Sequence, residues 1–96
     1  MNRQCFVYIM TNHWHSVLYT GVASKLDVRV FHHKTGATPG FTSRYHVDLL
    51  VHHEEKAEVL SAIEREKQIK SWNRRRKMDL IATMNPNWRH LSEDWE

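Results

Sequence analysis

The stretch from Phe6 to His33, FVYIMTNHWHSVLYTGVASKLDVRVFHH, decides how this chain of 96 residues folds. Residues 5–10 form a continuous apolar run rich in β-branched and aromatic side chains, which predicts a strand covered on both faces. Residues 17–22 predict a second strand, and the short polar connection between the two runs predicts a hairpin. Gly21 would weaken a strand interior, so we expect it either to end the strand or to let another backbone or a ligand come close.

A helix is predicted to follow the hairpin, over about residues 25–34. Ser24 is a suitable N-cap because its hydroxyl can accept a hydrogen bond from a free N–H of the first turn. Leu26 and Val30 form an apolar stripe on one face of this helix. Gly36 is expected to end it, since glycine adopts the left-handed conformation found after many helices.

The C-terminal half predicts one strand and two helices, over residues 47–53, 56–70 and 72–84. The fold class is therefore α/β of the α+β type: a small three-stranded antiparallel sheet flanked by helices, in the order β-β-α-β-α-α. Residues 1–96 are expected to form a single domain, with a core over about 5–84 and a tail over 85–96.

One face of the helix over 56–70 contains an unexpected carboxylate. The side chains that share this face, at spacings of three and four, are those of Val59, Ala62, Ile63, Glu66 and Ile69. A buried carboxylate is costly unless it is paired or binds a cation. The ordinary alternative is an ion pair between Glu66 and Lys70 at i+4. The residues alone leave these two interpretations about even.

Two tyrosines and an Arg–His pair form a candidate phosphate-handling site. Tyr8 and Tyr19 lie on the two predicted strands, and Arg29 and His33 lie one turn apart on the following helix. Arg29 offers a planar fork of donors to a phosphate. Taken singly, each of these residues more often has an ordinary role. Tyrosines in strands are usually core residues, a lone helix arginine is usually solvated, and a lone histidine is usually structural.

In combination, these residues resemble the GIY-YIG nuclease family, and most of all its small, stand-alone, single-domain bacterial members. Four parts of the family pattern occur in order: Val7-Tyr8-Ile9, Tyr19-Thr20-Gly21, Arg29 with His33, and Ala62 with Glu66 and Ile69-Lys70. Val7 stands where the first motif has Gly, and Thr20 where the second has Ile. Many members also use an Asn near the end of the domain, for which Asn73 and Asn85 are candidates.

The resemblance implies a metal-dependent endonuclease that hydrolyses phosphodiester bonds in DNA. Its catalytic residues would be Tyr8, Tyr19, Arg29, His33 and Glu66. Glu66 would hold one divalent cation, Mg²⁺ or Mn²⁺, because hard ions prefer oxygen ligands. A tyrosine acts as a base only where a nearby cation lowers its ordinary pKa of about 10, and the residues do not say which tyrosine that is. Branched or damaged DNA is a candidate substrate, in repair or recombination.

Two alternatives remain open at this point. The chain could be a non-catalytic nucleic-acid-binding module on the same scaffold, or an interaction domain without a nucleic-acid role. Candidate DNA contacts are Arg44, Tyr45, Lys70, Arg74 and Arg75. Arg44 and Tyr45 combine charge with a stacking surface. The basic run that contains Arg74 and Arg75 more often marks a solvated helix face, and the net charge of +3 favours polyanions only weakly.

Composition excludes several other classes. Cys5 is the single cysteine, so no internal disulfide can form, which fits a reducing cytoplasm. No apolar run approaches the ~20 residues that span a membrane. The first residues do not show a basic stretch followed by an apolar one, so we do not expect a secretory signal. The chain has eight histidines, but one cysteine and neighbouring histidines that alternate across a strand argue against structural zinc. The oligomeric state is not predicted.

Overall fold

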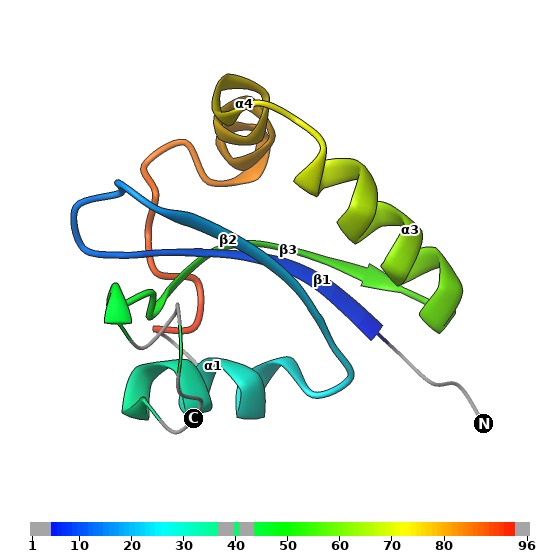
Figure 1. Ribbon diagram of the computed structural model, residues 1–96, viewed down its shortest axis with the longest axis horizontal. Helices are drawn as coiled ribbons and strands as arrows, with labels where there is room; N and C mark the ends of the chain where they lie inside the picture. The colour runs from blue at the N-terminus through cyan, green and yellow to red at the C-terminus, as the bar shows by residue number, and fades with distance from the viewer. Residues whose placement is uncertain (1–4, 37–39, 41–43, 94–96) are drawn as a thin grey trace.

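The computed structural model describes residues 5–36, 40 and 44–93. Its elements are β1 (Cys5–Thr11), β2 (Leu18–Ala23), α1 (Leu26–Thr35), β3 (Leu49–Lys56), α3 (Val59–Lys70) and α4 (Arg74–Met84). The strands form one antiparallel sheet in the order β2-β1-β3, which confirms the predicted fold class. Helix α1 lies on one side of this sheet, and α3 and α4 lie on the other (Figure 1).

The central strand β1 is buried on both faces, as its continuous apolar run predicted. Cys5, Val7 and Ile9 belong to the core beneath α3 and α4. Tyr8 and Met10 belong to the core beneath α1. Because successive side chains of a strand point to opposite faces, the alternation along β1 assigns Tyr8 to the α1 face.

A β-bulge interrupts the pairing of β1 with β3. Ile9 pairs with His52, but the next residue, Met10, pairs with Leu50. Val51 is therefore the extra residue, and it packs in the core beneath α3 and α4. A bulge of this kind lets two successive residues point to one face.

Several predicted element boundaries differ from those in the structure. The helices predicted over 56–70 and 72–84 begin later, at Val59 and Arg74, and β3 extends to Lys56. Lys25, not Ser24, is the N-cap of α1, and it makes no side-chain capping bond. The third strand begins at Leu49 rather than at residue 47. In α3, Val59 is 44% exposed, so the predicted apolar face does not extend to the first turn. The predicted end of α1 is confirmed, because Gly36 has φ 70°.

The chain after α4 returns to the outer edge of β3. The Asn85 side-chain amide donates to the Val51 carbonyl at 3.1 Å. The Leu50 N–H donates to His90 Nδ1 at 2.9 Å, and the Leu91 N–H donates to the Leu50 carbonyl at 2.7 Å. These bonds attach the tail to β3, which is an edge strand because β1 pairs with only one of its two sides. None of the helices in the described part of the chain is long and apolar enough to cross a membrane.

Candidate active site

The sheet and α1 bring three of the predicted site residues together. Tyr19 pairs with Met10, so it shares the α1 face of the sheet with Tyr8. The Tyr8 and Tyr19 ring centroids are 6.3 Å apart. The His33 ring, from α1, lies 6.0 Å from Tyr8 and 5.6 Å from Tyr19. Tyr8 is fully buried and His33 is nearly so, whereas Tyr19 is half-buried. We call Tyr8, Tyr19 and His33 the tyrosine cluster.

Gly21 makes room for this cluster. It pairs with Tyr8 across the β1–β2 ladder. A Cβ atom at position 21 would lie 2.5 Å from Tyr8 Oη and 2.6 Å from Tyr8 Cζ. Gly21 therefore does not end β2; it allows a close approach, and the approaching group is the Tyr8 ring.

Tyr8 and His33 are joined by a hydrogen bond of 3.4 Å between Oη and Nε2. The other ring nitrogen of His33, Nδ1, is buried and has no partner among the described residues. An orphaned buried N–H is rarer than an unpaired acceptor. We therefore assign the proton to Nε2, which then donates to the Tyr8 oxygen.

Arg29, an exposed residue of α1 one turn before His33, adds positive charge to the cluster. Burial is the largest of the influences that raise the pKa of Tyr8 to about 12, and the neighbouring Tyr19 contributes to the increase. The charge of Arg29 and its side-chain hydrogen bond to Tyr8 act in the opposite direction. Burial also lowers the pKa of His33, and Arg29 lowers it further, so the imidazole is neutral at pH 7.

Glu66 lies on α3, which covers the other face of the sheet from α1, and its negative charge makes the smallest of the contributions that raise the pKa of Tyr8. The carboxylate is 20% exposed and pairs with Lys70 Nζ at 3.3 Å. The ordinary alternative for Glu66, an ion pair at i+4, is therefore present in the structure. Both ends of the proposed catalytic set, Arg29 and Glu66, act on Tyr8.

The donor set around Glu66 fits one type of metal site. No group of three or more His, Cys, Asp or Glu side chains comes together in the part of the chain that the structure describes. Zinc and calcium sites need more protein ligands than one. Mg²⁺ usually keeps several waters and binds through one or two carboxylates plus substrate phosphates. A lone, partly exposed Glu66 suits that second type of site.

The residues predicted to contact DNA have different structural partners. Arg74 donates to the carbonyl oxygens of His15 and Ser16, so it supports the loop between β1 and β2. Arg75 is exposed and lies 3.6 Å from Asp79. The Arg44 guanidinium stacks 5.7 Å from the Tyr45 ring centroid, and both residues are exposed. Lys70 pairs with Glu66.

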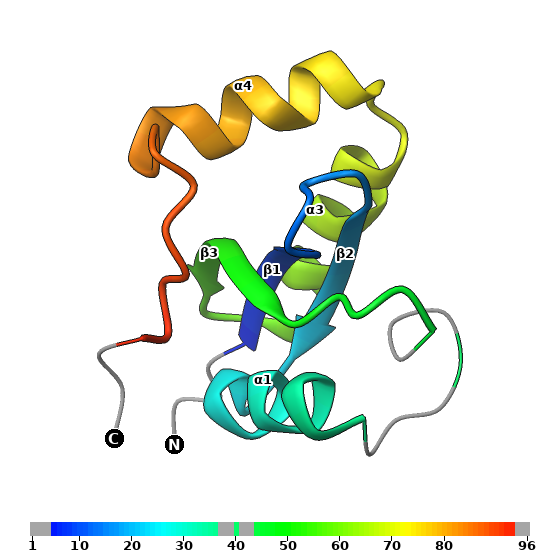
Figure 2. The same ribbon diagram turned by 90° about the vertical axis from the view of Figure 1, so that its left-hand side faces the viewer.

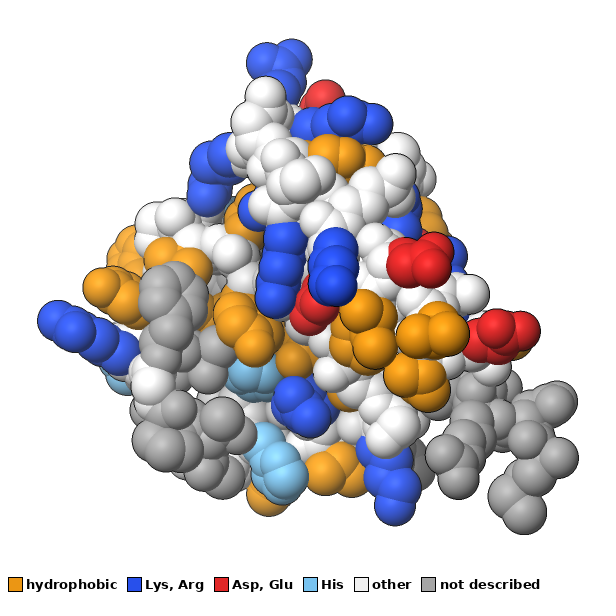
Figure 3. Space-filling view, turned by 45° about the vertical axis from the view of Figure 1, so that its right-hand side comes forward, with side chains coloured by type: hydrophobic (Ala, Val, Ile, Leu, Met, Phe, Trp, Pro, Cys, Tyr) orange, Lys and Arg blue, Asp and Glu red, His pale blue; other side chains and the backbone are white. Residues whose placement is uncertain are grey.

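Basic side chains spread over much of one face of the molecule. In Figure 3, Lys and Arg side chains run from the top of the molecule to its lower edge, with histidines among them in the lower half. Acidic side chains lie between the basic ones, near the top and around the middle of the view, mostly toward its right-hand side. The face can attract a polyanion, but its charge is mixed rather than uniform.

The two candidate asparagines have structural partners. Asn73 Oδ1 accepts a hydrogen bond from the Arg76 N–H at 2.9 Å, which caps α4. Asn85 is buried and bonds to the backbone of Val51 and Arg89. None of these partners belongs to the tyrosine cluster.

Sequence analysis missed a second ionic group, on the opposite face of the sheet. Glu54 accepts two hydrogen bonds from Arg65, at 2.9 and 3.1 Å, and lies 2.8 Å from His52 Nε2. Burial opposes its ionisation, but the bonds from Arg65 and His52 prevail and lower the pKa of Glu54 to about 2. In the sequence, Glu54 is one of several acidic residues and stands just after an apolar run. No sequence pattern therefore distinguishes it from an exposed glutamate.

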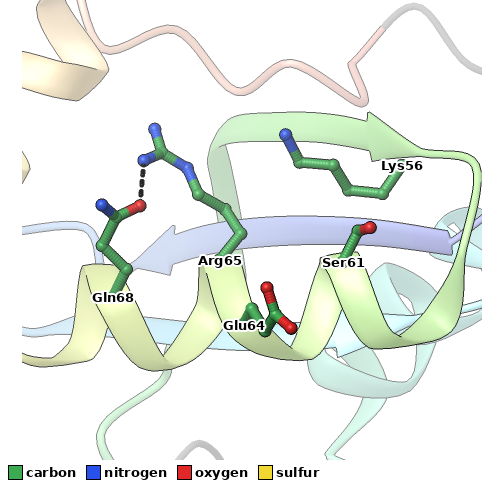
Figure 4. Close-up of a pocket in the computed structure, with 5 residues that line it drawn as sticks. All are labelled: Lys56, Ser61, Glu64, Arg65 and Gln68. Atoms are coloured by element: carbon green, nitrogen blue, oxygen red, sulfur yellow. Dashed lines mark hydrogen bonds between the residues drawn. The ribbon is translucent and has the colours of Figure 1, made fainter.

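Arg65 also borders an open pocket of about 400 Å³. Its lining consists of Lys56, Ser61, Glu64, Arg65 and Gln68, and Arg65 donates to Gln68 at 2.6 Å (Figure 4). The pocket lies along α3 and β3, so it belongs to the Glu54 group and not to the tyrosine cluster.

The comparisons with known proteins agree with this geometry. A family model described as the GIY-YIG catalytic domain matches residues 4–79. Among solved structures, the solution NMR structure of a UPF0213 protein from Bacillus halodurans is similar, with a TM-score of 0.59 and 23% sequence identity. The similarity covers 96% of this chain and 97% of that chain, and it shows a shared fold. A search of curated proteins found no match.

Proposed function

The chain belongs to the GIY-YIG family of nucleases, and on that premise we propose that it is an endonuclease that hydrolyses phosphodiester bonds in DNA with the help of a divalent cation. The observation that carries the proposal is the convergence on Tyr8. Tyr19 and His33 lie within about 6 Å of its ring, and the charges of Arg29 and Glu66 both act on it. Four of the predicted site residues therefore act on the fifth, Tyr8, either by ring contact or by charge.

Tyr8 Oη is the group that we assign to remove a proton from the attacking water. Its phenol is neutral in the free protein, because burial holds its pKa near 12. Its phenolate would be stabilised by Arg29 and by the Nε2–H of His33. As the water oxygen bonds to phosphorus, one P–O ester bond breaks and the leaving oxygen takes up a proton.

The remaining residues bind and orient the phosphate. Arg29 offers several donors in one plane, so it can contact a phosphoryl oxygen while it acts on Tyr8. Tyr19 is half-buried beside the cluster, so its hydroxyl can orient the water or the phosphate. Glu66 would hold the cation, with Lys70 released from its ion pair. A bound Mg²⁺ or Mn²⁺ supplies Lewis-acid charge that neutralises the developing negative charge.

The direct test is cleavage of plasmid and branched DNA by purified protein with Mg²⁺ or Mn²⁺. Glu66→Ala and Arg29→Ala should each reduce the rate by at least about a hundredfold. Glu64→Ala is the matched control, since Glu64 is an exposed residue of the same helix and should leave the rate unchanged. Cleavage that persists in both the Glu66 and the Arg29 variants would reject the proposal.

A non-catalytic nucleic-acid-binding module is the second candidate. It is favoured by one observation, the ion pair in which Lys70 neutralises Glu66. This candidate predicts DNA binding that weakens with salt and no cleavage with any divalent metal.

The substrate and the compartment are further parts of the proposal. We take branched or damaged DNA as the substrate to test first. The cytosol is the proposed compartment, because Cys5 is a free, buried thiol in a chain with no other cysteine.

A further inference from the structure

The loop between β1 and β2 is held closed by its own side chains. The Asn12 amide donates to Ser16 Oγ at 2.8 Å, and Asn12 Oδ1 accepts from the Ser16 N–H at 2.9 Å. Thr11 Oγ1 donates to the Val17 carbonyl at 2.7 Å. Three side-chain hydrogen bonds across so short a loop leave it little conformational freedom.

The same loop is also fastened from outside. The Arg74 guanidinium donates to the carbonyl oxygens of His15 and Ser16. The His15 ring stacks on Trp88, with centroids 4.7 Å apart and planes 28° apart. Figure 2, which faces the hairpin turn, shows it beneath the N-terminal half of α4. The loop is therefore a rigid support between α4 and the tail.

This rigid loop presents an exposed indole. Trp14 is 71% exposed and contacts the edge of the neighbouring His13 ring, with centroids 5.6 Å apart. Among the tryptophans in the described residues, Trp72 and Trp88 are half-buried and packed against the core. Trp14 is the exception, although indoles ordinarily contribute to folding by burying a large apolar area.

The loop that carries the exposed indole lies against the basic first turn of α4. Arg74 fixes the loop against the first turn of α4, which continues with Arg75, Arg76 and Lys77. The Arg75 side chain is 84% exposed, so it can reach a ligand in solution. An exposed aromatic face beside a basic track is the combination by which proteins bind single-stranded nucleic acid.

We propose that Trp14 stacks on an unpaired base of the DNA, while the basic first turn of α4 contacts the neighbouring phosphates. This inference rests on the proposed function and narrows its substrate to DNA with a single-stranded segment near the cut. Tyr19 follows Trp14 by five residues, and five extended residues span at most about 18 Å. The stacked base would therefore lie within a few nucleotides of the scissile phosphate.

The test is fluorescence anisotropy in EDTA, so that no cleavage occurs, with a labelled oligothymidylate of about 12 nucleotides and a blunt duplex. Wild type should bind the single strand more tightly than the duplex. Trp14→Ala should weaken single-strand binding about 5- to 150-fold. Trp14→Phe should retain most of the affinity, because Phe also stacks. Met84→Ala is the matched control, since Met84 is equally exposed, at 71%, near the far end of α4.

The salt dependence of DNA binding distinguishes the stacking contact of Trp14 from the phosphate contacts of α4. Trp14→Ala removes no charge, so the slope of log affinity against log salt should stay as in wild type. Arg75→Gln should reduce the magnitude of that slope by about 0.7, the value for one phosphate contact on a single strand. Three results would overturn the inference: single-strand binding unchanged in Trp14→Ala, equal loss for single strand and duplex, or loss in Trp14→Phe as large as in Trp14→Ala.

Failure of this inference differs from failure of the proposed function. If wild type binds the oligothymidylate through Trp14 but no metal supports cleavage, the stacking site stands and the nuclease assignment fails. If wild type cleaves DNA and Trp14→Ala binds and cleaves as wild type does, the nuclease assignment stands and the stacking site fails.

Discussion

Tyr8 is subject to opposing influences that decide its protonation. Burial, Tyr19 and Glu66 favour the neutral phenol, whereas Arg29 favours the phenolate. The balance raises its pKa to about 12, which is above the working range of a base at pH 7. Tyr8 can then act as a base only if a bound cation shifts that balance. In the free protein, Tyr8 is therefore a neutral phenol at pH 7.

We expect the cleavage rate to rise about tenfold per pH unit from about pH 6.5 and to level off at the pKa that Tyr8 has with the cation bound, because the phenolate fraction rises tenfold per unit only below the pKa. Tyr8→Phe should lose this slope and about 10²- to 10⁴-fold of the rate. Single-turnover cleavage at saturating cation measures both, and circular dichroism shows whether the variant is folded. A rate in wild type that does not depend on pH would contradict the role of Tyr8.

Gly21→Ala should destabilise the protein by about 1–3 kcal/mol, because the new Cβ would lie 2.5 Å from Tyr8 Oη in a packed core. Urea denaturation gives this cost. In a Tyr8→Leu background, which lacks both Cζ and Oη, the same substitution should cost much less. An equal cost in the two backgrounds would show that the Tyr8 ring is not what Gly21 accommodates.

At the scale of single elements, some features could be predicted from the sequence and others could not. The apolar run of β1 and the glycine after α1 are local signals, and both predictions are confirmed. The bulge at Val51 arises from pairing between strands that are distant in the sequence, so no local sequence pattern predicts it. The face of α3 was predicted from periodicity alone, but Val59 is exposed because the first turn extends past the core.

Glu54→Gln should destabilise the protein by about 1–3 kcal/mol at pH 7, because it leaves Arg65 without its carboxylate partner in a half-buried site. The folded pKa of Glu54, about 2, lies below its ordinary value of 4.5. Its contribution is therefore complete above pH 4.5 and is lost as the pH falls toward 2. Urea denaturation of both proteins across this range should show the difference shrinking. Glu64→Gln, at an exposed position of α3, should change stability by less than about 0.5 kcal/mol.

At the scale of the whole molecule, a group of contacting residues could be predicted from the sequence only where its members are close together along the chain. The tyrosine cluster was predictable because its members lie within one stretch, with Tyr8, Tyr19 and His33 on two strands and the next helix. The Glu54 group and the hold of Arg74 on the β1–β2 loop were not predictable. Each joins residues that become neighbours through the packing of α3 and α4, and their side chains are individually unremarkable.

The free energy of unfolding should fall as the pH drops from about 7.5 to 5.5. Burial lowers the pKa of His33, His53 and His90, so the unfolded chain takes up protons first, below about pH 6.5. Protonation of His90 would also compete with the hydrogen bond that its Nδ1 accepts from Leu50. Urea denaturation at several pH values measures the trend.

His90→Gln should flatten this pH dependence. His46→Asn is its control, because His46 is exposed with φ 54° and Asn tolerates that backbone conformation. If the stability of His90→Gln depends on pH as strongly as that of wild type, then protonation of His90 does not contribute to the loss of stability at low pH.

The bonds from the tail to Leu50 and Val51 have a consequence for anyone who shortens this chain. A sheet edge with unpaired N–H and carbonyl groups is a template for pairing with another chain. Removal of the residues after Met84 would uncover that edge while the motif residues stayed in place. We expect such a truncated protein to aggregate during expression, which light scattering would detect, although every residue of the proposed catalytic set is still present.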